Sequence, residues 1–324
     1  MNEKRPTVSI VIPTLNSGRT IRKCLDSIIG LDCPKDKLEI IIVDGGSVDD
    51  TLEIAKKYQV KVISIKKRGR GLAYNVGFKF AKGEYVAYLD SDAYASSNWI
   101  NASLKGFEED EKLGVVYNKN LAPEDSPFFQ RCIDVLHSRG RGQANGAIYR
   151  KKALEDIGGF NQDVVYLQET ELKNRLRVVG YRERFLDDGI IYHYPRSSIA
   201  TYAQQCLESG IGVFQLLNQT GGWERMANLF LTALTPFVLI LIAIFSLANE
   251  ENFTFLFSII TLFVVSVFYG LIVYRTTEQR YRRWHYIILA VPLSYSARVT
   301  GFLGFIYGLM MHKAGDANEK KFIQ

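Results

Sequence analysis

The distribution of hydrophobic residues divides the chain into two parts of different character. Up to about Trp223, short apolar runs alternate with charged and turn-forming stretches, as in a water-soluble domain. Beyond it, Met226–Ala248 is a run of 23 residues without a charge, and Phe253–Tyr274 is another of 22. Each run reaches the ~20 residues that a helix needs to cross the apolar core of a bilayer. We therefore expect a soluble domain followed by membrane-spanning helices.

A third apolar stretch, Ile287–Met311, is long enough to span but has Arg298 near its centre. A bare charge in the middle of a bilayer is costly, so a spanning helix requires Arg298 to face protein, water or a lipid phosphate. A re-entrant or interfacial segment is the alternative. The pattern leaves both open.

The loops around these runs predict an orientation. Residues 249–252 are short and acidic, whereas residues 275–285 carry four arginines. Because positively charged loops stay on the cytoplasmic side, the large soluble domain is expected there, in a multi-pass protein of the cell membrane. The first apolar run, Val8–Pro13, is too short for a signal peptide. A net charge of +6 fits a domain that rests against anionic lipid, and a solvated basic surface without a partner is the alternative.

The soluble part alternates two hydrophobic periods. Short runs that are apolar throughout, typical of strands buried on both faces, are separated by stretches with helical spacing, such as Ile21, Leu25 and Ile28. This alternation indicates an α/β fold with a doubly wound, mostly parallel sheet, similar to a Rossmann fold. The expected strands are Val8–Ile12, Leu38–Val43, Val60–Ile65 and Tyr85–Leu89.

The pattern after Leu89 is less regular. Residues 143–160 have a strand, helix and turn pattern, and residues 165–182 have an amphipathic helix that ends at Gly180. Phe185–His193 has the pattern of a last strand. Ser198–Leu217 is amphipathic and leads into the first apolar run, as expected of a helix that lies in the membrane interface.

Polar side chains follow each expected strand, at residues 13–16, 44–47, 66–70 and 90–92. Because ligands of such sheets bind outside the carboxyl ends of the strands, one crevice should hold all of them. Asp90 and Asp92 are separated by one serine, and their mutual repulsion indicates that a cation lies between them. The sequence contains neither a Walker loop nor a GxGxxG motif.

Five motifs, in this order and spacing, resemble those of the family 2 glycosyltransferases with the GT-A fold. The resemblance covers about Val8–Leu217, and with the apolar C-terminal part the chain looks most like membrane enzymes of polysaccharide assembly, the succinoglycan-type glucosyltransferases. Residues 192–198, YHYPRSS, are similar to a segment of that branch. The motifs are PTLN at 13–16, DGGSVDDT at 44–51, DSD at 90–92, IGGF at 157–160 and QETELKNRL at 168–176.

The resemblance implies an inverting transfer from a nucleoside diphosphate sugar, with Mg²⁺ or Mn²⁺ stabilising the departing diphosphate. By analogy Asp90 lies near the donor ribose or sugar and, with Asp92, ligates the metal. Asp44 holds the edge of the nucleotide base. Capped turns are the alternative for both motifs. The pocket wall is formed by Pro13, Thr14 and Asn16.

Three further residues are candidate ligands of phosphate or metal. His193 follows the last strand and is expected to reach the metal or the diphosphate, with a hydrogen-bonded histidine at a strand end as the alternative. Arg68, in the basic loop 66–70, and Arg196 are expected to bind the diphosphate of the donor or of a lipid. A solvated basic rim is the alternative for both arginines.

The acceptor hydroxyl needs a base opposite the leaving group. Family members usually have Glu-Asp there, with the Asp as base, whereas this chain has Gln168-Glu169. Glu169, at the start of a helix, is the preferred base and Glu171 its rival. The two cannot face the same pocket, because helix positions two apart point in nearly opposite directions. A surface ion pair with Arg175, four positions on, would explain Glu171 instead.

The expected function is therefore a metal-dependent glycosyltransferase that adds one sugar to a polyprenyl-linked glycan at the cytoplasmic membrane face. In the resembled branch UDP is the expected carrier of the sugar, with GDP as the alternative. The alternatives are a polyprenyl-phosphate sugar synthase and a non-catalytic scaffold. Membrane lipid is an expected partner and nucleic acid is not. The oligomeric state stays open, a homodimer included. The expected parts are a catalytic domain (1–197), an interfacial helix region (198–225), a transmembrane region (226–311) and a polar tail (312–324).

Overall fold

The computed structural model describes residues 7–66, 69–137, 143–220, 238–239, 242–246, 249, 252–276 and 284–313. The chain divides into two compact units. Unit 1 comprises residues 1–126 and 140–194, and unit 2 comprises residues 127–139 and 195–324. Each unit is described by itself below.

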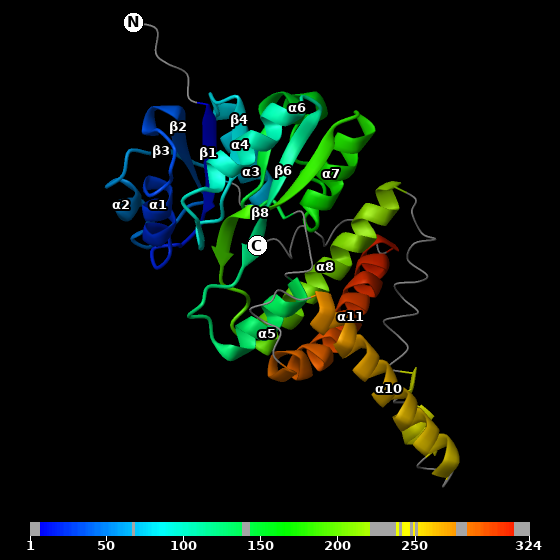
Figure 1. Ribbon diagram of the computed structural model, residues 1–324. Helices are drawn as coiled ribbons and strands as arrows, with labels where there is room; N and C mark the ends of the chain where they lie inside the picture. Colours follow the sequence, from blue (N-terminus) through cyan, green and yellow to red (C-terminus); the bar gives the residue numbers. More distant parts are fainter. Residues whose placement is uncertain are drawn as a thin grey trace, which may run out of the picture. The chain divides into compact units, whose positions relative to one another are not determined.

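Unit 1 is built on an eight-stranded sheet in the order β3-β2-β1-β4-β7-β6-β8-β5 (Figure 1). The expected strands near the amino terminus are all present, as are those expected within residues 143–160 and 185–193, whereas β5 and β6 were not predicted. The strands are β1 Val8–Thr14, β2 Leu38–Asp44, β3 Lys61–Ser64, β4 Tyr85–Tyr88, β5 Ala93–Ala95, β6 Leu113–Leu121, β7 Ile148–Arg150 and β8 Arg182–His193.

The sheet is mostly parallel, as expected, but mixed, because two of its eight strands run against the other six. Strands β3, β2, β1 and β4 pair in parallel, as do β6 and β8. However, β7 runs antiparallel to both β4 and β6, and β5 runs antiparallel to β8. Hydrophobic periodicity is the same for a strand in either direction, so the pattern did not show that these two short strands reverse.

Helices cover both faces of the sheet because side chains alternate along each strand. Ile10 and Ile12 of β1 belong to one buried cluster, together with side chains of α1, α2 and α4. Val11 of β1 belongs to the other, with side chains of α3, α6 and α7. The helices of unit 1 are α1 Ile21–Ile29, the 3₁₀ helix η1 Lys35–Lys37, α2 Thr51–Ala55, α3 Arg70–Phe80, α4 Trp99–Glu109, α6 Lys151–Ile157 and α7 Gln168–Val178.

Unit 2 is helical in its described part. Its helices are α5 Phe128–His137, α8 Ile199–Thr220, α10 Asn252–Thr276 and α11 Trp284–Lys313. Glycines let α8 and α11 approach closely, since a Cβ added to Gly304 would lie 2.0 Å from the carbonyl oxygen of Leu207. Phe214 of α8 and Phe305 of α11 then pack edge to face, with ring centroids 5.6 Å apart.

Within the described residues, one helical segment is long and apolar enough to cross a membrane, Leu289–Gly308 of α11. It lies inside the third expected stretch, and Arg298 within it is half-buried. The second expected span corresponds to α10, whose shorter apolar run is Phe253–Val267. Most of the first, 226–248, lies outside the described residues. The structure thus provides one candidate span, and a multi-pass arrangement stays a prediction.

A pair of helical glycines tests the packing of helices on the sheet. A Cβ added to Gly77 of α3 would lie 2.1 Å from Cγ1 of Val11, whereas one added to Gly106 of α4 would lie 3.4 Å from its nearest neighbour, Cγ2 of Val116. Gly77→Ala is therefore expected to lower the free energy of unfolding by about 1–3 kcal/mol. The matched control Gly106→Ala gains helix propensity and is expected to change it by less than about 1 kcal/mol. Chemical denaturation measures both, and equal effects would contradict the close packing of α3.

Candidate active site

A pocket of about 690 Å³ lies in unit 1, beside the carboxyl ends of β1, β2 and β4. Its position follows from the parallel pairing of these strands, which brings their following loops to one edge of the sheet. All four of the predicted polar segments contribute residues to the wall. The side chain of Asp44 is not among them. Those used below are Pro13, Thr14, Asn16, Arg70, Asp90 and Asp92.

Asp44 does not line the pocket but caps its own turn at the end of β2. It is 1% exposed. Its carboxylate accepts hydrogen bonds from the hydroxyl of Ser47 at 2.5 Å and from the backbone N–H of Gly46 at 3.0 Å. These contacts match the turn-capping alternative. Contact with a nucleotide base stays a proposal.

Asn16 ties the loop after β1 to the loop after β2. Its backbone φ is +50°, a conformation that asparagine adopts more readily than most residues. Its side-chain oxygen accepts a hydrogen bond from the N–H of Val48 at 2.9 Å, and its own N–H donates to the hydroxyl of Ser47 at 2.9 Å. Two loops of the pocket wall are therefore held together without a ligand.

Both oxygens of the Asp90 carboxylate have protein partners. The hydroxyl of Tyr74 donates to Oδ1 at 3.0 Å, and a guanidinium nitrogen of Arg70 lies 3.7 Å from Oδ2. Burial is the largest cause that raises the pKa of Tyr74 well above its usual value, and the negative charge of Asp90 raises it further. The phenol thus keeps its proton and remains a donor to Asp90.

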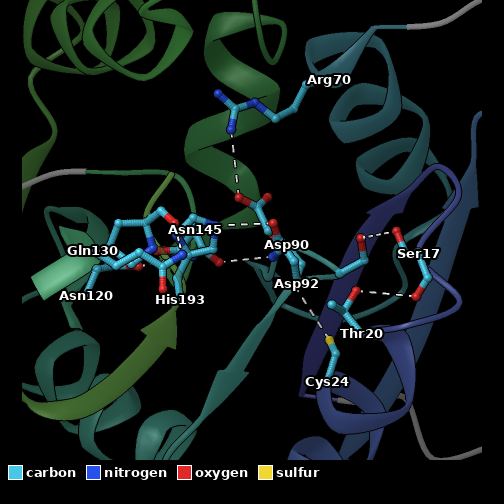
Figure 2. Close-up of polar contacts among 12 residues, drawn as sticks. Ser17, Thr20, Cys24, Arg70, Asp90, Asp92, Asn120, Gln130, Asn145 and His193 are labelled. Carbon is cyan, nitrogen blue, oxygen red and sulfur yellow. Dashed lines mark hydrogen bonds and ion pairs between the residues drawn. The ribbon is translucent and has the colours of Figure 1, made fainter. Parts of the chain in front are cut away.

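The backbone of Asp90 is held by a pair of asparagines, which lie to its left in Figure 2. The side-chain oxygen of Asn145 accepts from the Asp90 N–H at 3.0 Å, and its amide nitrogen donates to Oδ1 of Asn120 at 3.1 Å. Asn120 in turn donates to the carbonyl of Asn145 at 3.0 Å. The reciprocal bonds give the buried Asn145 the partners that its amide requires.

Asp90, Asp92 and His193 form a cluster that fits a divalent metal ion. One ligand atom from each lies within 4.8 Å of the others. Pairing of β5 with β8 places His193 opposite Ala93, next to Asp92, and the His193 Nε2 to Asp92 Oδ2 distance is 3.3 Å. Two carboxylates and an imidazole are ligands that Mn²⁺ accepts, and carboxylate oxygens also suit Mg²⁺.

The two candidate bases on α7 have different surroundings. Glu171 is 7% exposed and forms a bidentate pair with Arg175, both distances being 2.7 Å. The expected Glu171 to Arg175 pair is present, but it is buried rather than at the surface. Glu169 instead faces a residue of the pocket wall, with Oε1 at 3.7 Å from a nitrogen of Arg70.

The structure does not test the two remaining predicted ligands. Arg68 lies outside the described residues, and Arg196 is exposed and belongs to unit 2. Two contributors were missed by the sequence interpretation, namely Tyr74 and Asn145. Tyr74 lies in a helix pattern and Asn145 comes 55 residues after Asp90, so only the fold reveals their contacts.

Comparisons with known proteins agree with this arrangement. A family model described as "Glycosyl transferase family 2" matches residues 9–161, which include β1 to β7 of the sheet and the Asp90 to Asp92 segment. The succinoglycan-type branch is not singled out by these comparisons.

Among the relatives is a dolichyl N-acetyl-alpha-D-glucosaminyl phosphate 3-beta-D-2,3-diacetamido-2,3-dideoxy-beta-D-glucuronosyltransferase of Methanococcus voltae. It is 26% identical over 229 residues, which cover 63% of this chain and 71% of the relative. Some other relatives are much longer proteins, of which the chain covers 13%.

Two solved structures have a similar fold. A mannosyltransferase of Pyrobaculum calidifontis in complex with GDP-Man and Mn²⁺ is 22% identical, with a TM-score of 0.53 over 67% of this chain and 64% of that chain. TarS residues 1–349 of S. aureus in complex with UDP is 20% identical, with a TM-score of 0.50 over 95% of this chain and 92% of that chain. At these identities the likeness supports a GT-A-like α/β fold alone.

The asparagine pair gives a test of how the Asp90 segment is held. Asn145→Ala leaves the Asp90 N–H without its acceptor and is expected to lower the free energy of unfolding by about 1–3 kcal/mol. In a double-mutant cycle with Asn120→Ala, the two changes should couple by at least about 0.5 kcal/mol. Asn174→Ala, at an exposed position of α7, is the matched control and should cost less than about 0.5 kcal/mol. Purely additive losses in the cycle would rule out the reciprocal pair.

Proposed function

Because residues 9–161 belong to glycosyl transferase family 2, we propose that this enzyme is an inverting transferase that moves a sugar from a nucleoside diphosphate sugar, UDP-linked, to a polyprenyl-linked glycan at the cytoplasmic membrane face. The observation that carries the proposal is the cluster of Asp90, Asp92 and His193, whose ligand atoms lie within 4.8 Å of one another at the pocket. The two similar structures hold nucleoside diphosphate compounds, GDP-Man in one and UDP in the other, which supports such a ligand for this chain.

The donor diphosphate would lie above the carboxyl ends of β1 and β4, where the cluster is located. Asp90, Asp92 and His193 would hold Mg²⁺ or Mn²⁺, which when bound supplies positive charge that stabilises the departing diphosphate. Pro13, Thr14 and Asn16 shape the neighbouring wall, with Asp44 behind it holding the turn. In this proposal Arg68 and Arg196 bind phosphate groups of donor or acceptor.

Glu169 is the proposed general base. It would take the proton from the acceptor hydroxyl while that oxygen forms a bond to the anomeric carbon of the sugar. The bond from the anomeric carbon to the diphosphate oxygen breaks, and the diphosphate takes the electron pair. Attack from the side opposite the leaving group inverts the anomeric centre. Glu171 is less suited to this role, because both of its oxygens are already bound to Arg175.

A membrane-bound acceptor is supported by the C-terminal part of the chain. The relative of Methanococcus voltae is named for a dolichyl-linked acceptor, and α11 contains a segment apolar enough to span a membrane. A lipid-linked acceptor and a tethered enzyme meet in two dimensions, which raises their effective concentration.

The proposed organisation of the chain follows the same argument. A cytoplasmic catalytic domain of residues 1–197 is followed by an interfacial helix region at 198–225 and a multi-pass transmembrane region at 226–311. A polar tail comes last, at 312–324. Reporter fusions after residues 250 and 280 would test this topology by showing whether the two loops lie on opposite sides.

Removing one metal ligand tests the proposed donor site. Asp92→Asn is expected to weaken binding of Mn²⁺ in the presence of UDP by at least about tenfold, because a neutral amide replaces an anionic ligand. Isothermal titration calorimetry measures the affinity. Asp187→Asn is the matched control, since Asp187 lies on β8 but is 76% exposed and pairs with Lys119. Unchanged joint binding of manganese and UDP in Asp92→Asn would refute the metal site.

Removing the proposed base separates the acceptor classes. Glu169→Gln is expected to lower kcat for transfer to a polyprenyl-linked glycan by about 10²–10⁴-fold, the usual size of a general-base effect. A screen of nucleotide sugars for diphosphate release, with membrane lipid extract as acceptor, provides the assay, and Glu155→Gln on α6 is the charge-matched control. A loss of only a few-fold would favour a polyprenyl-phosphate sugar synthase, because a phosphate acceptor needs no strong base. Absence of metal-dependent turnover with every donor would favour a scaffold.

A further inference from the structure

Arg70 lies between the two halves of the site. One of its guanidinium nitrogens is 3.7 Å from Oδ2 of Asp90, and the other is 3.7 Å from Oε1 of Glu169. The carboxylates are 17% and 18% exposed, whereas the arginine side chain is 57% exposed on the pocket wall. A single cation therefore bridges a proposed metal ligand and the proposed base. Figure 2 shows its contact with Asp90.

The backbone keeps Arg70 close to Glu169. Arg70 is the first residue of α3 and Gln168 the first residue of α7, so each carries its side chain at a helix start. The helix starts are in direct contact, because a Cβ added to Gly71 would lie 2.5 Å from the side-chain nitrogen of Gln168. The side-chain nitrogen of Gln168 is also fixed, since it donates to the carbonyl of Val164 at 2.7 Å. Arg70 can thus change its contact with Asp90 while α3 and α7 stay in place.

The structure also shows what a metal ion would have to displace. Oδ2 of Asp90 faces Arg70, and Oδ1 is hydrogen-bonded to Tyr74. A guanidinium is suited to hold two carboxylates at once, because its planar fork offers donors in two directions. A divalent cation at Asp90 would compete for the same oxygen and repel the guanidinium by like charge.

We propose that Arg70 is a positioning residue that substitutes for the metal's charge at Asp90 in the empty site and is released to Glu169 when metal and nucleotide bind. This inference rests on the proposed function, since it takes Asp90 as a metal ligand and Glu169 as the base. In the empty site Arg70 divides its charge between the two carboxylates. When metal and nucleotide are bound, all of the guanidinium donors of Arg70 are available to Glu169 and to the donor phosphates. Donor binding and orientation of the base are thereby linked through one side chain.

The decisive experiment measures Mn²⁺ binding without nucleotide. The full chain in detergent is titrated with Mn²⁺, and the free ion is followed by its electron paramagnetic resonance signal. Arg70→Gln is expected to bind Mn²⁺ about fivefold more tightly than the wild type, the effect of removing one partly screened charge. Arg70→Lys keeps the charge and should restore an affinity near that of the wild type. Lys152→Gln on α6, which removes an equal charge that pairs with Asp156, should leave it unchanged.

A second measurement, of kcat, tests whether Arg70 also orients Glu169. At saturating Mn²⁺ and donor, Arg70→Gln is expected to lower kcat by about tenfold through loss of the charge that orients Glu169. A merely structural role of Arg70 would weaken both metal binding and catalysis, whereas the proposed role makes the first stronger and the second weaker.

The outcomes separate this inference from the proposed function. If the wild type transfers sugar in a Mn²⁺-dependent way but Arg70→Gln binds Mn²⁺ equally or less tightly, the role of Arg70 is wrong and the transferase proposal stands. If no transfer is detected with any donor, the proposed function is wrong. Tighter Mn²⁺ binding by Arg70→Gln would still show in that case that Arg70 competes with metal for Asp90.

Discussion

The repulsion between carboxylates at the carboxyl end of β4 is the constraint on which the site depends. Asp90 and Asp92 lie near each other and, through Arg70, near Glu169, so this edge of the sheet concentrates negative charge in a partly buried crevice. Such charge is tolerated only with a nearby cation or hydrogen-bond donors. Tyr74, Arg70 and His193 supply these partners in the protein itself, and the Asn145 amide holds the backbone beneath them.

The strands that create this crevice were readable in the sequence because they are short apolar runs. Their parallel pairing brings Asp90 and the loops after β1 and β2 to one edge, which is why the polar residues at strand ends led to the pocket. The reversed strands β7 and β5 were not readable, since hydrophobic alternation carries no direction. The same limit applies to partners distant along the chain, such as Asn145 with Asp90.

The side chains on α7 show a second limit of sequence interpretation. Glu169 and Glu171 are chemically alike and two positions apart, so the sequence favoured Glu169 as the base and an Arg175 partner for Glu171 without excluding the reverse. The fold distinguishes them, because Arg175 uses its remaining donors on the carbonyls of Ile157 and Gly159 and thereby fixes Glu171 among backbone groups. For the C-terminal apolar runs the sequence is more informative than the structure. The runs are evident from composition, whereas most of residues 226–248 lies outside the described structure.

Strand β5 has only three residues and lies at the end of the sheet, next to β8. Its register sets Ala93 against His193, and a slip by one residue would turn the imidazole to the opposite face, away from Asp92. A metal ion held by Asp92, which directly precedes β5, and by His193 of β8 would therefore cross-link the two strands at this edge of the sheet. Such an ion would stabilise the pairing of β5 with β8 and slow hydrogen exchange of the β5 amides, so it would have a structural role as well as a catalytic one.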